Sequence, residues 1–232
     1  MDVDLNCDLG EGCPFDDQLM ALVTSVNIAC GYHAGDASTA RTALTSALAL
    51  GVQAGAHPSF PDREHFGRIE MARTEAQVFD DCVYQIGALA GLARAAGVRL
   101  RHVKPHGALY HRACRDDAFG RAVVEAAALF ELWVVGLPGS RLEALSAGRC
   151  PFVAEGFADR RYLSDGTLVP RTQPHAFIED AAAAVQQVVW LLRERRVRTI
   201  CVHGDNPQAL DFVREVRAAL TTAGYRISPF NP

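Results

Sequence analysis

One lysine, Lys104, stands in this sequence where every other strongly basic side chain is an arginine. Of the 23 lysines and arginines in the 232 residues, 22 are arginines. An ammonium is a compact, rotatable point charge, whereas a guanidinium is a planar fork, so the two serve different chemistry. Lys104 is therefore a candidate catalytic residue. The count alone is equally compatible with chance, since a lysine-poor chain can retain one lysine anywhere.

Aspartates and histidines that could move protons lie in further short motifs along the chain. The candidates for this role are Asp8, His57, His106, His203 and Asp205. Carboxylates and imidazoles held in position accelerate proton transfer by roughly 10²- to 10⁴-fold. A mixed oxygen and nitrogen set could instead bind zinc, and such a set is formed by Asp8, His33, His57 and His203. These histidines lack the i, i+4 helical spacing of familiar zinc motifs, which favours proton transfer over a metal.

The candidate residues lie in or near seven segments with the composition of β-strands, most of them followed by a helical pattern. The segments are residues 3–9, 25–30, 52–57, 100–104, 132–137, 152–157 and 199–203. In six of them polar and apolar residues alternate, so that the polar side chains share one face. Central strands of an open parallel sheet are instead apolar on both faces. The alternation favours a closed barrel with polar groups inside and a site at the carboxyl ends of its strands.

Helices are predicted between these strands, most clearly over residues 74–96 and 177–195, where apolar residues recur every three or four positions. Thr74 with Gln77 is a capping box that begins the first of these helices, and Gly97 ends it. No linker, low-complexity tract or charge block divides the chain. We therefore expect one α/β domain over residues 1–232, a single (β/α)7 barrel related to the TIM barrel.

Composition and charge exclude several classes of protein. The chain is 49% hydrophobic, with a net charge of −4 and no basic stripe, so no nucleic-acid partner is expected. Its longest apolar stretch is shorter than the ~18 residues of a membrane span, and its acidic first residues are unlike a signal peptide. The seven cysteines form no CxxC pair, which is typical of reduced thiols in the cytosol. We expect a soluble cytoplasmic protein that does not contact the membrane.

Longer motifs resemble one known family. They are DLNCDLGEG at 4–12, SVNIACGYHAGD at 25–36, GAHP at 55–58, FGR at 66–68, VKPHGALY at 103–110, FADR at 157–160 and CVHGD at 201–205. In this order they resemble the LamB/YcsF family, and the resemblance extends along nearly the whole chain. Departures from the family pattern at Cys13-Pro14, Ile69 and His111 leave the candidate catalytic residues unchanged.

The resemblance implies a barrel of the glycoside hydrolase/deacetylase type, in agreement with the strand faces. The family is that of the A subunit of the bacterial ATP-dependent 5-oxoprolinase. Membership implies opening of the 5-oxo-L-proline (pyroglutamate) lactam to L-glutamate, with hydrolysis of ATP to ADP and phosphate, in a complex with B and C subunits. ATP, with Mg²⁺, enters only through this resemblance, because the chain has no P-loop motif and Gly10-Glu11-Gly12 lacks the third glycine of a dinucleotide motif.

Within that activity the candidate residues take hypothetical roles. Asp8 or Asp205 would be the base, and a histidine among His57, His106 and His203 would move protons. Lys104 would hold the substrate carboxylate or the transferring phosphoryl group as a point charge. The candidate substrate-binding residues are Asn6, Glu11, Asn27, His33, Asp36, Arg68, Glu155, Asp159, Arg160 and Arg171. The arginines among them could clamp an anion through paired hydrogen bonds.

Two other functions stay as alternatives. One is a metal-dependent, deacetylase-like hydrolase of N-acyl or carbohydrate substrates that needs no ATP. The other is a non-catalytic subunit that binds 5-oxoproline or a sugar. Chelator sensitivity without ATP dependence would favour the first alternative. Ligand binding without turnover, even with partner subunits present, would favour the second.

Overall fold

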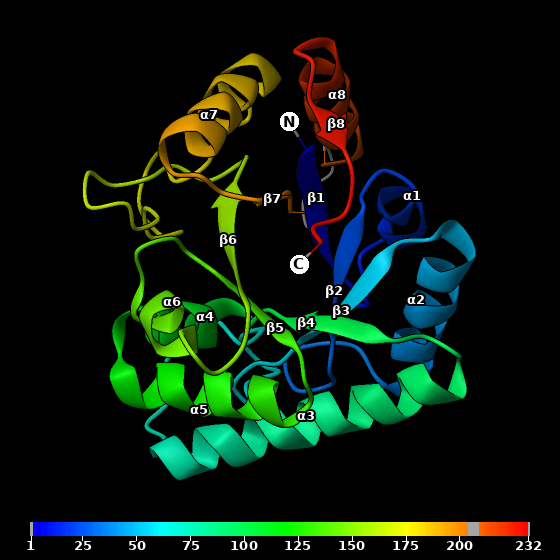
Figure 1. The fold of residues 1–232 in the computed structure, drawn as a ribbon, viewed down its shortest axis with the longest axis vertical. Helices are drawn as coiled ribbons and strands as arrows, with labels where there is room; N and C mark the ends of the chain where they lie inside the picture. The colour runs from blue at the N-terminus through cyan, green and yellow to red at the C-terminus, as the bar shows by residue number, and fades with distance from the viewer. Residues whose placement is uncertain (1, 204–208, 232) are drawn as a thin grey trace.

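The computed structural model describes residues 2–203 and 209–231, and its centre is a closed barrel of parallel strands (Figure 1). The strands are β1 (Asp2–Leu9), β2 (Ser25–Ala29), β3 (Gln53–His57), β4 (Leu100–Val103), β5 (Trp133–Gly136), β6 (Phe152–Phe157), β7 (Thr199–Cys201) and β8 (Arg226–Ile227). Strand β1 pairs with β2 on one side and with β7 on the other, which closes a ring of 7 strands. The short β8 pairs only with the first residues of β1. The predicted seven-stranded barrel is confirmed.

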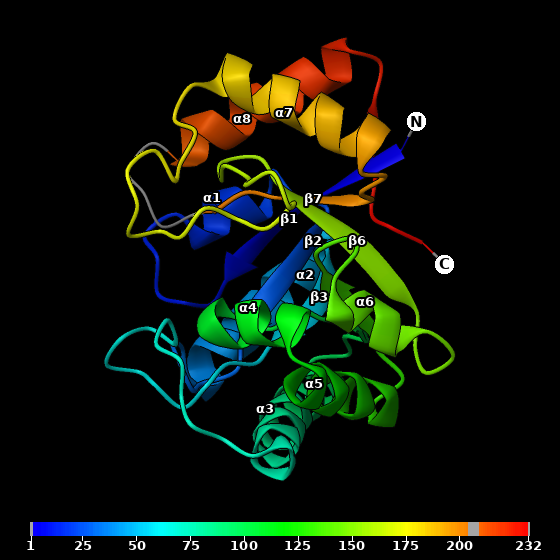
Figure 2. The ribbon, with the colours of Figure 1, turned by 90° about the vertical axis from the view of Figure 1, so that its left-hand side faces the viewer.

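Helices connect the strands and cover the outside of the barrel. They are α1 (Asp16–Met20), α2 (Ala37–Leu50), α3 (Glu75–Ala95), α4 (Gly107–Arg115), α5 (Asp117–Leu129), α6 (Arg141–Ser146), α7 (Ala181–Glu194) and α8 (Ala209–Thr222). Helices α3 and α5 pack together on one side of the molecule, and α7 and α8 pack together on the opposite side (Figures 1 and 2). The barrel therefore lies between two helical layers, with α2 alongside β2 and β3.

Helix α3 shows how the local sequence sets its own boundaries. The hydroxyl of Thr74 accepts a hydrogen bond from the Gln77 backbone N–H (3.2 Å), and the Gln77 side chain accepts one from the Thr74 N–H (2.9 Å). This confirms the predicted capping box. Gly97 follows the last turn with a φ of 72°, a left-handed conformation that glycine adopts without strain. Of the predicted apolar stripe, Val78, Cys82, Ile86 and Leu89 are buried, and Leu92 and Ala96 are half-buried.

The long connection between β6 and α7 differs from its prediction. Helix α7 begins at Ala181, not at Phe177, and the carboxylate of Asp180 caps it by accepting from the Ala183 N–H (2.7 Å). Phe177 instead forms an isolated antiparallel bridge with Arg160. The residues before Asp180 are thus a packed loop at the carboxyl ends of the strands. This loop supplies Arg160 and Arg171 to the pocket described below.

The inside of the barrel is filled by polar side chains in layers. In the lowest layer, the one nearest the amino end of β1, the buried carboxylate of Asp4 accepts hydrogen bonds from the hydroxyls of Thr24, Ser25 and Thr199. In the next layer Asn6 donates to Glu155 (3.1 Å), while Asn27 donates to Asn6 (2.8 Å). Buried polar groups are costly unless they are paired. The polar faces that the sequence predicted are therefore an ordered network.

His102 on β4 belongs to the same layer as Asn27 and requires a glycine at position 55 on the neighbouring strand β3. Its Nε2–H donates to Asn27 Oδ1 (2.7 Å), and its ring lies against the backbone of Gly55 on β3. A Cβ at Gly55 would lie 2.2 Å from the His102 ring. Only glycine at this position leaves room for the imidazole inside the barrel.

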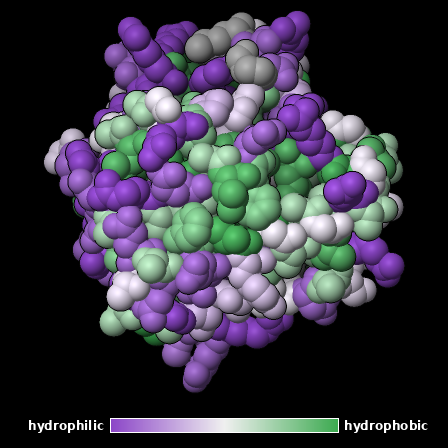
Figure 3. Space-filling model, turned by 60° about the horizontal axis from the view of Figure 1, so that its bottom comes forward, coloured by the Kyte–Doolittle hydropathy of each residue, from purple (hydrophilic) through white to green (hydrophobic). Residues whose placement is uncertain are grey.

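The surface carries hydrophilic and hydrophobic residues side by side, as the face in Figure 3 shows. Large hydrophobic side chains stay exposed on several helices, among them Leu48 and Leu50 on α2, Tyr84 on α3, Leu129 on α5 and Trp190 on α7. Within residues 2–203 and 209–231, none of the helices has the length and apolar composition that crossing a bilayer requires.

Candidate active site

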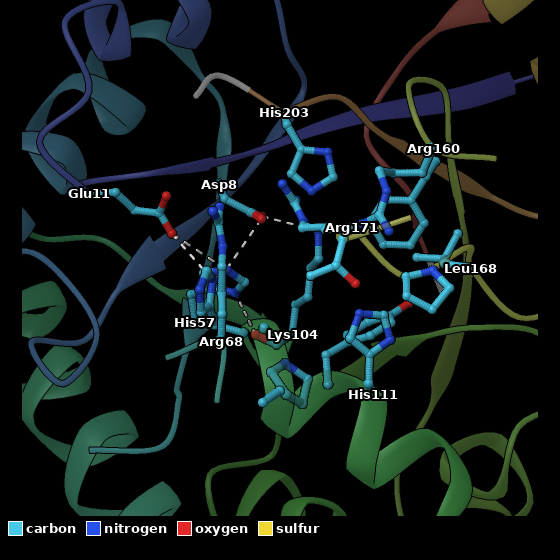
Figure 4. A pocket seen from close by; sticks show the side chains of 18 residues that line it. Asp8, Glu11, His57, Arg68, Lys104, His111, Arg160, Leu168, Arg171 and His203 are labelled. Carbon is cyan, nitrogen blue, oxygen red and sulfur yellow. Dashed lines mark hydrogen bonds and ion pairs between the residues drawn. The ribbon is translucent and has the colours of Figure 1, made fainter. Parts of the chain in front are cut away.

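A cavity of about 400 Å³ opens at the carboxyl ends of the strands (Figure 4). Its polar and aromatic walls are formed by Asp8, Glu11, His57, Arg68, Lys104, His106, Tyr110, His111, Phe157, Arg160, Arg171 and His203. Asp8 comes from the end of β1, Glu11 from the loop that follows it, His57 from β3, and Lys104 from the residue after β4. The pocket therefore lies where barrel enzymes build their sites.

Most of the predicted site residues meet here. Those that line the pocket are Asp8, Glu11, His57, Arg68, Lys104, His106, Arg160, Arg171 and His203. Asn6, Asn27 and Glu155 lie in the barrel interior, in contact with Asp8 or Lys104. His33 contacts Glu11 from outside the set of lining residues, and Asp159 contacts His203 in the same way.

Asp36 is not brought to the pocket. Its carboxylate caps α2 by accepting from the backbone N–H groups of Ser38 (2.9 Å) and Thr39 (2.8 Å), and it is exposed. The backbone donors hold the pKa of Asp36 below its usual value. Its position gives it a structural task at the start of a helix. Asp205, also predicted as a site residue, lies outside the described residues.

Lys104 is buried among acceptors at the base of the pocket, with 2% of the residue exposed. Its Nζ lies 2.8 Å from Glu155 Oε1 and 3.1 Å from Asp8 Oδ1, and it donates to Asn6 Oδ1 at 3.2 Å. Burial disfavours the ammonium, but the carboxylates of Asp8 and Glu155 outweigh burial and raise the pKa of Lys104 well above its usual value. The side chain is a fixed positive charge in the pocket.

Asp8 and His57 form an ion pair beside this charge, with Asp8 Oδ2 3.3 Å from His57 Nε2. The Nδ1–H of His57 donates to the backbone carbonyl of Lys104 (2.7 Å), which fixes the ring orientation. Burial opposes both charges, but each partner stabilises the other: the pKa of Asp8 falls well below its usual value and that of His57 rises. His57 can therefore hold a proton at the pocket wall, while Asp8 is a weak base.

Two more histidines surround the carboxylate of Glu11. Its Oε1 lies 2.9 Å from His33 Nε2, 3.4 Å from His106 Nδ1 and 3.8 Å from His57 Nε2. The rings of His33 and His106 stack with centroids 3.8 Å apart. Burial lowers the pKa of both rings, and for His106 the neighbouring His57 and His33 lower it further, to well below its usual value. His106 is therefore neutral.

His203 faces the same pocket from the residues after β7. Its Nδ1–H donates to Asp159, with distances of 2.7 and 3.0 Å to the two carboxylate oxygens, and its ring stacks on Phe157. Burial opposes the charge of Asp159, but His203 outweighs it and lowers the pKa of the carboxyl. Because Nδ1 is committed to Asp159, Nε2 is the nitrogen that can exchange a proton with a ligand.

An arginine cluster forms the side of the pocket opposite Glu11 (Figure 4). Arg160 is 2% exposed and donates to the Val169 carbonyl (2.6 Å), while its Nε is buried without a hydrogen-bond partner among the described residues. Burial and the nearby Arg171 lower the pKa of Arg160 to about 10. Like charges so close together are suited to an anionic ligand that bridges them.

Several lining residues had no predicted role, among them the aromatic residues Tyr110, His111 and Phe157. His111 is neutral, because burial and then Arg160 and Arg171 lower its pKa to about 4. The sequence held a signal for Tyr110 and His111, because both lie on α4, which begins shortly after Lys104. Residues in the first turns of a helix that follows a barrel strand lie near the barrel mouth.

The fold and this pocket define the class of protein, a TIM-like (β/α)7 barrel of the deacetylase type with its site at the carboxyl ends of the strands. The structure of a family 4 carbohydrate esterase from Streptomyces lividans aligns over 100% of this chain and 93% of that chain, with a TM-score of 0.54. At 12% sequence identity, this likeness shows the fold alone.

The chain belongs to the LamB/YcsF family, whose model matches residues 3–232. A relative from Tolumonas auensis, named as the A subunit of 5-oxoprolinase, is 47% identical over 97% of this chain and 98% of its own length. The crystal structure of a lactam utilization protein from Thermus thermophilus aligns with a TM-score of 0.91 at 40% identity, over 99% of this chain and 100% of that chain. These relatives support a role in 5-oxoproline metabolism.

Proposed function

We propose that the chain opens the lactam of 5-oxo-L-proline to L-glutamate, as the A subunit of an enzyme that couples this step to hydrolysis of ATP. The names of the two similar proteins support the substrate. The observation that carries the chemistry is the buried Lys104 ammonium beside the Asp8–His57 pair, in a pocket whose opposite side is an arginine cluster. Acids, a base and anion-binding groups thus surround one small cavity.

The arrangement suits an activated lactam. An unactivated amide carbonyl is a poor electrophile, and transfer of the γ-phosphoryl group of ATP to its oxygen gives a carbon that water can attack. ADP leaves in that step, and phosphate and glutamate follow after water addition. Arg160, Arg171 and Lys104 would bind the substrate carboxylate and the phosphoryl group as fixed positive charges. Mg²⁺ would accompany ATP, and the B and C subunits are the proposed partners for its use.

Proton transfers can be assigned to two histidines. His203 Nε2 would take the proton from the attacking water, because Asp159 fixes the Nδ1–H tautomer. His57, which Asp8 keeps protonated, would give a proton to the ring nitrogen as the carbon–nitrogen bond breaks. Asp8 itself is too strongly paired with Lys104 and His57 to be the base. In this proposal a histidine is the base in place of Asp8; the other expected base, Asp205, lies outside the described residues.

Glutamate release from 5-oxoproline tests the proposal. The chain is mixed with its B and C partners, with and without ATP, and His57→Gln is compared with the surface control His65→Gln, since His65 is exposed and pairs with Asp62 outside the pocket lining. We expect release that requires ATP, is retained in the control and falls at least ~100-fold in His57→Gln. Absence of release under every condition would contradict lactam opening. Release of acetate from N-acyl substrates without ATP would support a metal-dependent hydrolase instead.

A further inference from the structure

We propose that His106 is a positioning residue, whose Nδ1 accepts the Nε2–H of His57 and holds the proton of the proposed acid in place. The turn at Phe66–Gly67 sets the tautomer of His106 that this hydrogen bond requires. The effect on turnover rests on the proposed lactam opening, whereas the hydrogen bond can be tested in the chain alone. His106 thus has a different task from the direct proton transfer that its sequence motif suggested.

Two backbone carbonyls determine which ring nitrogens carry hydrogens. His57 Nδ1 lies 2.7 Å from the Lys104 carbonyl oxygen, and His106 Nε2 lies 2.9 Å from the Phe66 carbonyl oxygen. A carbonyl oxygen only accepts, so both of these nitrogens donate. The remaining nitrogens, His57 Nε2 and His106 Nδ1, lie 2.9 Å apart. One hydrogen must lie between them, because two neutral rings would face each other with lone pairs at a hydrogen-bond distance.

The charges around the two rings place this hydrogen on His57. Asp8 Oδ2 lies 3.3 Å from His57 Nε2, while Glu11 Oε1 lies near both nitrogens and accepts from His33. Burial opposes a charge on His57, but Asp8 outweighs it and raises the pKa of His57. Burial and the neighbouring His57 lower the pKa of His106 well below its usual value. His57 is therefore the imidazolium, and His106 is the neutral acceptor.

The turn that supplies the Phe66 carbonyl has a strained backbone. Phe66 has a φ of 57° and Gly67 a φ of 65°, so two successive residues adopt the left-handed conformation. This conformation is uncommon for a bulky residue and is often found at functional sites. A Cβ at Gly67 would lie 2.9 Å from His33 Cβ and 3.1 Å from His106 Cδ2, so only glycine lets the turn approach both rings. The turn holds one carbonyl oxygen against one nitrogen of His106 in spite of this strain.

The ring of His33 fixes the plane of His106. The two rings stack with centroids 3.8 Å apart and an interplanar angle of 4°. His33 is held in turn by Glu11, whose Oε1 lies 2.9 Å from His33 Nε2. Since the rings lie in separate parallel planes, one metal ion cannot lie in the plane of both. Hydrogen bonds therefore join the cluster formed by Glu11, His33, His57 and His106.

Both nitrogens of His106 are committed, although its ring lines the pocket. Nε2 donates to Phe66 and Nδ1 accepts from His57, so neither nitrogen is left for a ligand. In the proposed opening, the Nε2–H bond of His57 breaks and the hydrogen bonds to the lactam nitrogen as the carbon–nitrogen bond breaks. Two lone pairs would then face each other at 2.9 Å, which favours the return of a proton from solvent to His57. His106 therefore acts on turnover through His57.

Nitrogen NMR of the chain alone tests the hydrogen bond without substrate, ATP or partner subunits. The ring signals are assigned from their changes in His57→Gln and His106→Asn. We expect both nitrogens of His57 and only Nε2 of His106 to carry hydrogens, with a scalar coupling across the hydrogen bond between His57 Nε2 and His106 Nδ1. The proposal is overturned if His106 carries a hydrogen on Nδ1, or if His57 Nε2 carries none.

Turnover separates this positioning role from a merely structural one. His106→Asn keeps an acceptor oxygen close to the place of Nδ1, and His106→Ala removes the acceptor. We expect kcat for glutamate release to fall at least ~10-fold in His106→Ala, with KM nearly unchanged, and to recover largely in His106→Asn. Equal losses of kcat in both variants, each shown to be folded by circular dichroism, would contradict the acceptor role. Absence of release by the wild-type chain would contradict lactam opening, and NMR would still decide the hydrogen bond.

Gly67→Ala tests whether the turn sets the tautomer of His106. The added Cβ should displace the Phe66 carbonyl, so NMR should show a second population of His106 with its hydrogen on Nδ1. Gly51→Ala is the matched control, because Gly51 ends α2 with a φ of 68° and a Cβ there would meet nothing within 4 Å. It should lose stability from the same backbone strain and keep the Nε2–H tautomer of His106. An unchanged tautomer in folded Gly67→Ala protein would overturn the role of the turn.

Discussion

Lys104 and Glu155 meet inside the barrel although they come from strands that are not neighbours. Lys104 follows β4 and Glu155 lies on β6, and Nζ is 2.8 Å from Oε1. Glu155 is fully buried, so its carboxylate depends on Lys104 and on the Asn6 amide for compensation. The ion pair joins the polar network in the barrel to the pocket above it. A change in Lys104 therefore affects both the pocket charge and the barrel interior.

Replacing Lys104 by arginine should abolish most turnover. A planar guanidinium cannot occupy the narrow position between Asp8 and Glu155 that the ammonium fills. We expect kcat for ATP-dependent glutamate release to fall by at least ~100-fold, with the far-ultraviolet circular dichroism unchanged. Arg101→Lys, on the exposed face of β4, is the matched reverse substitution and should leave kcat unchanged. Normal turnover in Lys104→Arg would show that no lysine is required there.

Burial should also protect Lys104 from amine reagents. Only 3% of its side chain is exposed, and its raised pKa disfavours the reactive neutral amine. Since this is the sole lysine, reductive methylation followed by intact-mass measurement reports on one side chain and the α-amino group. The native chain should gain one modified amine, and the chain unfolded in guanidinium should gain two. Equal labelling of both amines in the native chain would show that Lys104 is accessible.

Asp159 should act on catalysis through His203. Its carboxylate accepts the Nδ1–H of His203 at 2.7 Å, and Asp159→Asn replaces this anion by a neutral amide. We expect kcat to fall at least ~10-fold with little change in KM, because the substrate is held by other groups. NMR of the histidine ring nitrogens should show a mixture of His203 tautomers in the variant. A variant that changes KM alone would mean that Asp159 contacts substrate.

Asp36 should matter for stability and not for turnover. It caps α2 through the backbone N–H groups of Ser38 and Thr39, away from the pocket. Loss of such a cap in Asp36→Ala costs about 1 kcal/mol of unfolding free energy, which denaturant titration measures. Asp36→Asn retains a capping oxygen and should lose less. Reduced glutamate release by a folded Asp36→Ala protein would restore this residue to the site.

The fold was predictable from sequence because barrel strands alternate visibly between an apolar and a polar face. The same alternation identified Asn6, Asn27 and Glu155, whose polar neighbours lie on adjacent or facing strands. The start of α7 was missed because Ile178 is buried in the loop before the helix. Its spacing from Ala181 continues the three-to-four-residue recurrence of apolar residues that marks a helix. A periodic pattern reports burial, and it does not separate a buried loop residue from a buried helical one.

The site was predictable as a set of residues but not as a set of pairs. Asp36 lies in the motif that also holds Asn27 and His33, yet the chain turns after His33 and begins a helix. The Asp36–Thr39 spacing carried that information, since it is a capping pattern. The stacking of His33 on His106 joins segments far apart in sequence. Such a contact depends on how the barrel closes. The sequence predicts that a barrel forms, but not which side chains then meet.

Asp4, in the lowest layer of the barrel, should give stability a distinct pH dependence. Burial raises its pKa from 3.8 to about 6, although hydroxyl donors from Thr199, Thr24 and Ser25 oppose the rise. The native chain therefore binds a proton at higher pH than the unfolded chain does. Stability from this protonation is fully present below pH ~4 and is lost as the pH rises through about 6.

The side chain of Asn in Asp4→Asn does not titrate. The unfolding free energies of the variant and the wild-type chain should therefore depend differently on pH. Relative to the variant, the unfolding free energy of the wild-type chain should fall by roughly 2 kcal/mol between pH 4 and pH 7, because one pKa unit corresponds to about 1.4 kcal/mol and the unfolded carboxyl is already partly ionised at pH 4. Urea titrations of both proteins at several pH values measure the difference. Asp2→Asn, at the exposed start of the same strand, is the control and should show no such fall, since the Arg226 partner of Asp2 lowers its pKa. A pH-independent difference between wild type and Asp4→Asn would mean that Asp4 is no harder to ionise in the barrel than in water.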